Sequence, residues 1–189
     1  MVSQIKVHEI IKQSGSARTI GESGDTITLP SSATLSNFPS NTPYFQATLS
    51  SEQTLSDNVN TKAAFNSELL DSAGAYDPST YRFTVPSGQA GRYYISASII
   101  FQTSGSYGVI FPRLEIHKNG VNQMYGYGPY NEQGNDQVGV FIAMVMDLSA
   151  SDYLEIYVRN NNDQGTPSIP ASTGSPDNKC IFQGYKLIG

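Results

Sequence analysis

Residues 61–101 read TKAAFNSELLDSAGAYDPSTYRFTVPSGQAGRYYISASIIF, and this stretch decides the fold. Aromatic and β-branched residues alternate in it with clusters of Gly, Pro, Asn, Asp and Ser, which is typical of short strands joined by tight turns. A closing partner, KCIFQGYKLI, occupies residues 179–188. The two segments together predict sheet structure from the middle of the chain to its end.

The composition supports one all-β domain. With 189 residues the chain can bury roughly 70% of the surface that it exposes when unfolded. Charged residues make up 14%, against 12 Tyr, 8 Phe and 17 Gly. The net charge of -5 disfavours nucleic acid and anionic membranes as partners. We expect no signal peptide, no membrane insertion, and a buried, unpaired Cys180.

Alternating apolar residues predict nine strands after residue 43. Asn119-Gly120 predicts a two-residue hairpin, because both residue types tolerate positive φ. A jelly-roll sandwich accommodates this number of strands. The expected ranges are 44–50, 60–66, 80–86, 91–103, 110–118, 121–130, 137–148, 153–160 and 179–188.

Separated blocks of the chain resemble the globular head domain of complement and its tumour-necrosis-factor relatives. The first three blocks contain Phe65, then Tyr76-Asp77 and Phe83–Pro86, and the remaining ones contain Gly91, Tyr93, Tyr94, RLEIHKNG at 113–120, Phe182, Gly184, Tyr185 and Leu187. The resemblance implies a jelly-roll β-sandwich whose inner sheet packs around a three-fold axis. We therefore expect a homotrimer.

Two strands are apolar on both faces, which independently predicts association. In VGVFIAMVMDL, residues 138–148, both sets of alternating positions are apolar, and the strand from Tyr93 behaves similarly. A sandwich core covers one face of a sheet, so the second face needs another chain. The alternative is that these side chains fill an uneven monomer core. The residues expected at the three-fold interface are Tyr94, Ile100, Phe141 and Val145.

Residues 1–43 form the first predicted region and residues 44–189 the globular head. The first region has few apolar residues and several Gly and Pro, so it cannot bury a core of its own. We interpret it as an attachment arm. Within it, GESGDTITLPSSATL at 21–35 resembles segments of bacteriophage fibre and virion proteins.

The longer connections of the head are expected at the end opposite the arm. They are the segments 51–59, 104–109, 131–136 and 161–178, whereas the short turns fall near the arm. Tyrosine and amide side chains supply contact area and hydrogen bonds at moderate entropic cost, and they suit sugars and protein surfaces. The candidate ligand-binding residues are Tyr107, Tyr127, Tyr130, Asn131, Asn161, Asn162 and Asp163.

No catalytic residues and no cofactor are predicted. His8 and His117 are expected to be solvated, and neither lies beside a candidate nucleophile. The sequence does not decide whether calcium binds. Oxygen donors are plentiful in the late loops, but their spacing matches no calcium loop. The donors in question are Asn160, Asn161, Asn162, Asp163 and Asp177.

These features predict a non-enzymatic virion protein on the particle surface: a trimeric fibre head or capsid decoration protein. Another virion protein would hold the arm, and a host-surface glycan or protein would meet the far loops. Three alternatives remain at this point. They are a pure capsid cement protein without receptor binding, a soluble lectin-like or cytokine-like binding module, and an enzyme.

Overall fold

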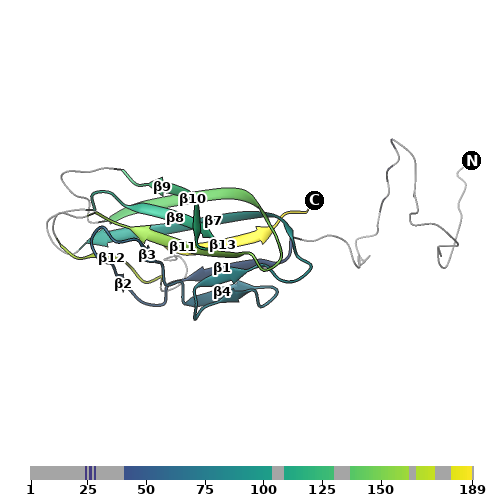
Figure 1. The fold of residues 1–189 in the computed structure, drawn as a ribbon, viewed down its shortest axis with the longest axis horizontal. Coiled ribbons are helices and arrows are strands. Elements are labelled where there is room, and N and C mark those ends of the chain that lie inside the picture. Colours follow the sequence, from purple (N-terminus) through teal and green to yellow (C-terminus); the bar gives the residue numbers. More distant parts are fainter. Residues whose placement is uncertain are drawn as a thin grey trace, which may run out of the picture. The chain divides into compact units, whose positions relative to one another are not determined.

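A computed structural model describes residues 41–103, 109–129, 137–161, 165–172 and 180–188, together with residues 24, 26 and 28. Its described residues form strands and no helix, in two antiparallel sheets (Figure 1). The all-β prediction is confirmed, and the arrangement is consistent with a jelly roll. Most of the predicted arm lies outside the described residues, so its role stays a prediction.

Sheet A follows the order β2-β12-β7-β13-β1-β4, and β10 pairs with β7. Its longest strands are β7 and β10, which pair along the whole of β10, from Gln137 opposite Gln102 to Leu148 opposite Gly91. The strands of sheet A are β1 (Tyr44–Thr48), β2 (Gln53–Thr54), β4 (Ser67–Asp71), β7 (Gly91–Thr103), β10 (Gln137–Leu148), β12 (Pro167–Ile169) and β13 (Ile181–Lys186).

Sheet B follows the order β5-β6-β11-β8-β9, and β3 pairs with β11. Strands β8 and β9 are joined by the predicted hairpin, in which Asn119 and Gly120 adopt φ values of 53° and 78°. The strands of sheet B are β3 (Thr61–Lys62), β5 (Tyr76–Asp77), β6 (Arg82–Thr84), β8 (Arg113–Lys118), β9 (Val121–Tyr127) and β11 (Tyr153–Arg159).

Most predicted strands are confirmed, and those at 91–103 and 137–148 have the observed ends. The predicted strands 60–66 and 80–86 are too long, because only β3 and β6 pair within them. Four short strands were not predicted: β2, β4, β5 and β12. Strand β4 reads SELLD, with Leu69 and Leu70 both exposed, so it lacks the alternation by which strands are recognised.

An aromatic cluster joins the two sheets, and it explains why residues 61–101 decide the fold. Phe45 of β1 stacks on Phe83 of β6 at 4.4 Å and meets Phe182 of β13 edge-on at 4.8 Å. The Tyr76 hydroxyl donates a hydrogen bond of 2.6 Å to the carbonyl oxygen of Phe65. These rings lie between the sheets and form the centre of the buried core.

Gly184 is required by close packing within sheet A. A Cβ atom at this position would lie 2.5 Å from Ile95 Cδ1 and 3.0 Å from both Phe45 Cε1 and the Tyr94 carbonyl oxygen. Because one of these neighbours is backbone, a side chain could not be accommodated by a rotamer change alone. The glycine in the closing segment therefore has a packing reason.

The chain enters and leaves the head at one end, called the base. Lys186 donates its backbone N–H to the Pro43 carbonyl oxygen, and Ile188 donates its backbone N–H to the Asn41 side chain. Leu187 N donates to the Arg92 carbonyl oxygen, and Leu148 pairs with Gly91, so the turn at 149–152 lies at the base. The Asn119-Gly120 turn lies there too, since Tyr153, directly after that turn, donates its N–H to Asn119 Oδ1. The C-terminal ends of β9 and β11 and the N-terminal end of β8 lie at the opposite end, called the far end.

Candidate functional site

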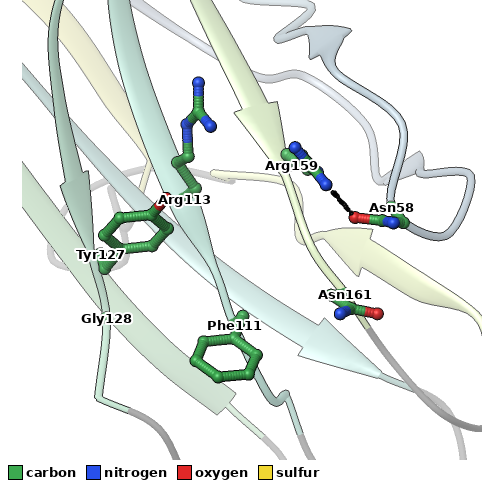
Figure 2. Close-up of a pocket in the computed structure, with 7 residues that line it drawn as sticks. All are labelled: Asn58, Phe111, Arg113, Tyr127, Gly128, Arg159 and Asn161. Atoms are coloured by element: carbon green, nitrogen blue, oxygen red, sulfur yellow. Dashed lines mark hydrogen bonds between the residues drawn. The ribbon is translucent and has the colours of Figure 1, made fainter.

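A pocket of about 420 Å³ opens at the far end of sheet B (Figure 2). It forms where β8 begins and where β9 and β11 end. In the sheet register Arg113 lies opposite Tyr127 on one side and opposite Arg159 on the other, so these three side chains share the outer face. The residues lining the pocket are Asn58, Phe111, Arg113, Tyr127, Gly128, Arg159 and Asn161.

Backbone hydrogen bonds hold the walls of the pocket together. Asn58 donates its N–H to the Asn160 carbonyl oxygen at 2.7 Å, and Gly128 donates to Pro112 at 2.9 Å. A longer bond of 3.4 Å joins Phe111 N to the carbonyl oxygen of Asn161. These bonds tie the connection after β2 and the segment before β8 to the ends of β9 and β11. The described walls of the pocket are thus connected to one another by backbone hydrogen bonds.

Arg159 is bound to a neutral partner. Its Nε donates to Asn58 Oδ1 at 2.7 Å, and its Nη2 donates to the same oxygen. Asn58 has a φ of 56°, a left-handed conformation that Asn tolerates better than most residues. Figure 2 shows the Arg159–Asn58 pair across the view from the rings of Phe111 and Tyr127. Among the described residues no carboxylate neutralises Arg159.

Arg113, in contrast, belongs to a buried charged network. Its Nη2 is paired with Glu115, whose side chain is 1% exposed. His117 Nε2 contacts the other carboxylate oxygen of Glu115 at 2.6 Å, and the Asn122 and Asn60 amides donate to that same oxygen. Burial acts to raise the pKa of Glu115, but the hydrogen bonds from His117 and Asn122 and the charge of Arg113 outweigh it. The pKa of Glu115 therefore lies below its ordinary value.

The expectation of a solvated His117 is wrong. The residue is 8% exposed, and its ring stacks on Tyr157 with 4.2 Å between centroids. Alternation correctly placed His117 on the outer face of β8. Neighbouring aromatic and arginine side chains then cover that face, which alternation cannot predict.

A second buried carboxylate lies further along the same face. Glu155, 3% exposed, accepts hydrogen bonds from Lys62 at 2.9 Å and from Arg82 at 2.8 Å. Arg82 also lies over the ring of Tyr153 at 3.8 Å. Burial acts to raise the pKa of Glu155, and the two cations more than offset it, so this pKa is also lowered. The outer faces of β8 and β11 thus carry polar, cross-linked networks, and the pocket lies at the far end of these strands.

The outer face of sheet A is different, because large apolar side chains lie open on it. Phe141 is 62% exposed and Val145 is 53% exposed, on alternate positions of β10. Val145 lies opposite Tyr94 of β7, and the Tyr94 ring contacts that of Tyr185 with 5.4 Å between centroids. Ile100 is partly buried on the same face. All four predicted interface residues therefore lie on one face, and their role as an interface stays a prediction.

Two of the predicted ligand-binding residues, Tyr127 and Asn161, line the pocket. The other five lie outside the described residues: Tyr107, Tyr130, Asn131, Asn162 and Asp163. The prediction did not include Asn58, Phe111, Arg113 and Arg159. The sequence did contain one signal for these two arginines. Arg113 and Arg159 each occupy an outward-facing position at the end of a strand.

Among the described residues no group of three or more His, Cys, Asp or Glu side chains could hold a metal ion. Of the candidate calcium donors, Asn160 is buried and Asn161 lines the pocket, while Asn162, Asp163 and Asp177 lie outside the described residues. The described part of the chain also contains no helix long and apolar enough to cross a membrane.

The fold is that of a complement globular head, a jelly-roll domain. Among solved structures, the chain is similar to the globular domain of zebrafish complement 1qA protein, with a TM-score of 0.50 and 16% sequence identity. The similarity covers 77% of this chain and 98% of that one. At this identity it shows the fold alone. No family model and no curated protein matches the chain.

Proposed function

We propose that the protein is a non-enzymatic homotrimeric head on the surface of a virion. The outer face of sheet A would form the three-fold interface, and residues 1–43 would attach the head to another virion protein. The far end would then face outward, toward a host-surface glycan or protein. The exposed apolar side chains of β10 are the observation that carries this proposal.

An apolar face on the two longest strands favours association. Burying a side chain such as Phe141 or Val145 contributes roughly 1.5–3 kcal/mol relative to leaving it in water. Three copies would each contribute both residues, together with Tyr94 and Tyr185. On sheet B the outer faces of β8 and β11 are occupied by the Glu115 and Glu155 networks, and the exposed large side chains among the described residues lie on β9: Val121, Tyr125 and Tyr127.

The position of the chain ends supports an outward far end. Residues 41–43 meet residues 186–188 at the base, while the pocket lies at the opposite end of the strands. An attachment that precedes residue 41 reaches the head at the base. Binding loops on a rigid scaffold opposite an anchor are a common arrangement. The virion setting itself rests on the resemblance of residues 21–35 to phage fibre and virion segments.

Comparing the full chain with residues 41–189 tests the attachment. The truncation keeps Asn41 and Pro43, which hydrogen-bond to the end of the head. We expect both proteins to form trimers and only the full chain to copurify with particles. A truncated protein that still joins the particle would contradict the role of the arm.

Binding of labelled full-length protein to host cells tests the far end. Saturable binding would support a receptor-binding head. A verified trimer that joins particles but binds no cell would instead indicate a capsid cement protein.

A further inference from the structure

We infer that the pocket at the far end of sheet B binds an acidic saccharide, with Arg159 holding the anionic group and Phe111 and Tyr127 contacting the sugar ring. This inference rests on the proposed function, in which the far end faces the host, and it names the class of ligand.

The first observation is an uncompensated positive charge. Two arginines are among the residues that line the pocket, and none of the described lining residues carries a carboxylate. The chain as a whole carries a net charge of -5, so the charge of the described lining residues is opposite in sign to the net charge of the chain. Arg113 is compensated by Glu115, whereas the partner of Arg159 among the described residues is the amide of Asn58. An anionic ligand would complete the charge pairing of the site.

The second observation is that donors remain available on Arg159. A guanidinium carries five N–H groups, and only Nε and Nη2 of Arg159 donate to Asn58. The side chain is partly exposed, so a ligand can reach it. Because Asn58 orients the guanidinium, part of the entropic cost of ordering it is met before a ligand binds. A carboxylate matches the planar donor arrangement of the remaining N–H groups.

The third observation is the apolar and amide lining. Phe111 is 45% exposed and Tyr127 is 57% exposed, so both side chains have surface in contact with solvent at the pocket. Sugars present C–H faces to aromatic rings and hydroxyls to amides. Asn161 offers a side-chain amide that makes no hydrogen bond to another described residue. The volume of about 420 Å³ lies within the range of small-molecule sites.

Ligand-observed NMR with the full chain tests the inference. The probes are methyl glucuronide, the methyl glycoside of N-acetylneuraminic acid, and methyl glucoside, which has a neutral hydroxymethyl group where the glucuronide has its carboxylate. Sodium acetate serves as an anion without a ring. We expect saturation transfer to at least one acidic glycoside, weaker transfer to methyl glucoside, and poor competition by acetate.

Three variants locate the site. Arg159→Gln should weaken binding of the acidic glycoside by about tenfold or more, because it removes a charged hydrogen-bond donor. Arg159→Lys keeps the charge but loses the planar fork, and it should bind with intermediate affinity. Lys118→Gln is the matched control, since it also removes one positive charge from sheet B, but at the base, where Lys118 pairs with Asp152 at 2.8 Å. It should bind as the wild type does.

Equal binding of glucoside and glucuronide, full competition by acetate, or unchanged binding by a folded Arg159→Gln protein would each overturn the inference. So would a lack of binding to both acidic glycosides. If the same protein is still a trimer that joins particles and binds host cells, the proposed function stands and only the ligand class falls. A monomer that joins no particle would instead remove the proposed function.

Discussion

Arg159 of β11 lies directly opposite Arg113 of β8 in the register of sheet B, so two cations face each other across neighbouring strands. Like charges in this position are ordinarily destabilising. Glu115 pairs with Arg113, whereas no carboxylate among the described residues pairs with Arg159 beside the pocket. A charge that folding alone would not favour is consistent with a role in binding.

Arg113 and Arg159 should therefore differ in their contribution to stability. Arg113→Gln leaves the buried Glu115 without its guanidinium, and we expect the free energy of unfolding to fall by about 1–3 kcal/mol. Arg159→Gln relieves the repulsion and loses a bond to an amide, so its effect should stay within about 0.5 kcal/mol. Urea unfolding of both variants measures the difference. Equal losses would contradict the assignment of Arg113 to the structural network.

Stability should decrease in acid because of the two buried carboxylates. Glu115 and Glu155 have a lower pKa in the folded protein than in the unfolded chain. Their contribution is therefore fully present above the unfolded pKa, which is about 4.3, and is lost as the pH falls through the folded pKa.

Urea unfolding across this pH range tests that dependence. We expect Glu115→Gln to be less stable than the wild type at neutral pH, with a smaller loss of stability on acidification. Parallel curves for the two proteins would show that Glu115 does not contribute to the pH dependence.

Gly184→Ala should destabilise the head by about 1–3 kcal/mol through overpacking. The new methyl group would lie 2.5 Å from Ile95 Cδ1 and 3.0 Å from the Tyr94 carbonyl oxygen. Gly120→Ala provides a comparison, because its Cβ would meet only Tyr153 Oη at 3.6 Å and its cost comes from a φ of 78°. In NMR spectra, changes in the chemical shifts of core residues should appear for Gly184→Ala and not for Gly120→Ala. A Gly184→Ala protein with the same urea midpoint of unfolding as the wild type would contradict the close packing at this position.

The sequence was sufficient for the strands whose apolar residues alternate, and for the hairpin at Asn119-Gly120. It was not sufficient for strands of two or three residues such as β2 and β5, because so few positions cannot show an alternation of apolar and polar residues. It also placed Phe141 and Val145 on one face of β10 and Ile142 on the other, since period 2 alone determines this.

The pocket was less predictable because it depends on register. A regular two-residue hairpin would place Gly126 opposite Arg113, but an irregularity between Ile116 and His117 shifts the pairing by one residue and brings Tyr127 there. Arg159 is brought to Arg113 by a different pairing, between β11 and β8. Asn58 comes from a connection far away in the sequence. Tyr127 and Asn161 could be proposed from composition, whereas the two arginines required the three-dimensional arrangement.

Native mass spectrometry of the wild type, Phe141→Asp and Val121→Asp tests the central claim most directly. Phe141 lies on the proposed interface, whereas Val121 is 63% exposed on β9 of sheet B and serves as the control. A carboxylate buried at the interface would cost several kcal/mol. The account predicts a trimer for the wild type and Val121→Asp and a folded monomer for Phe141→Asp. A monomeric wild type, or a Phe141→Asp protein that keeps the wild-type trimer, would contradict it.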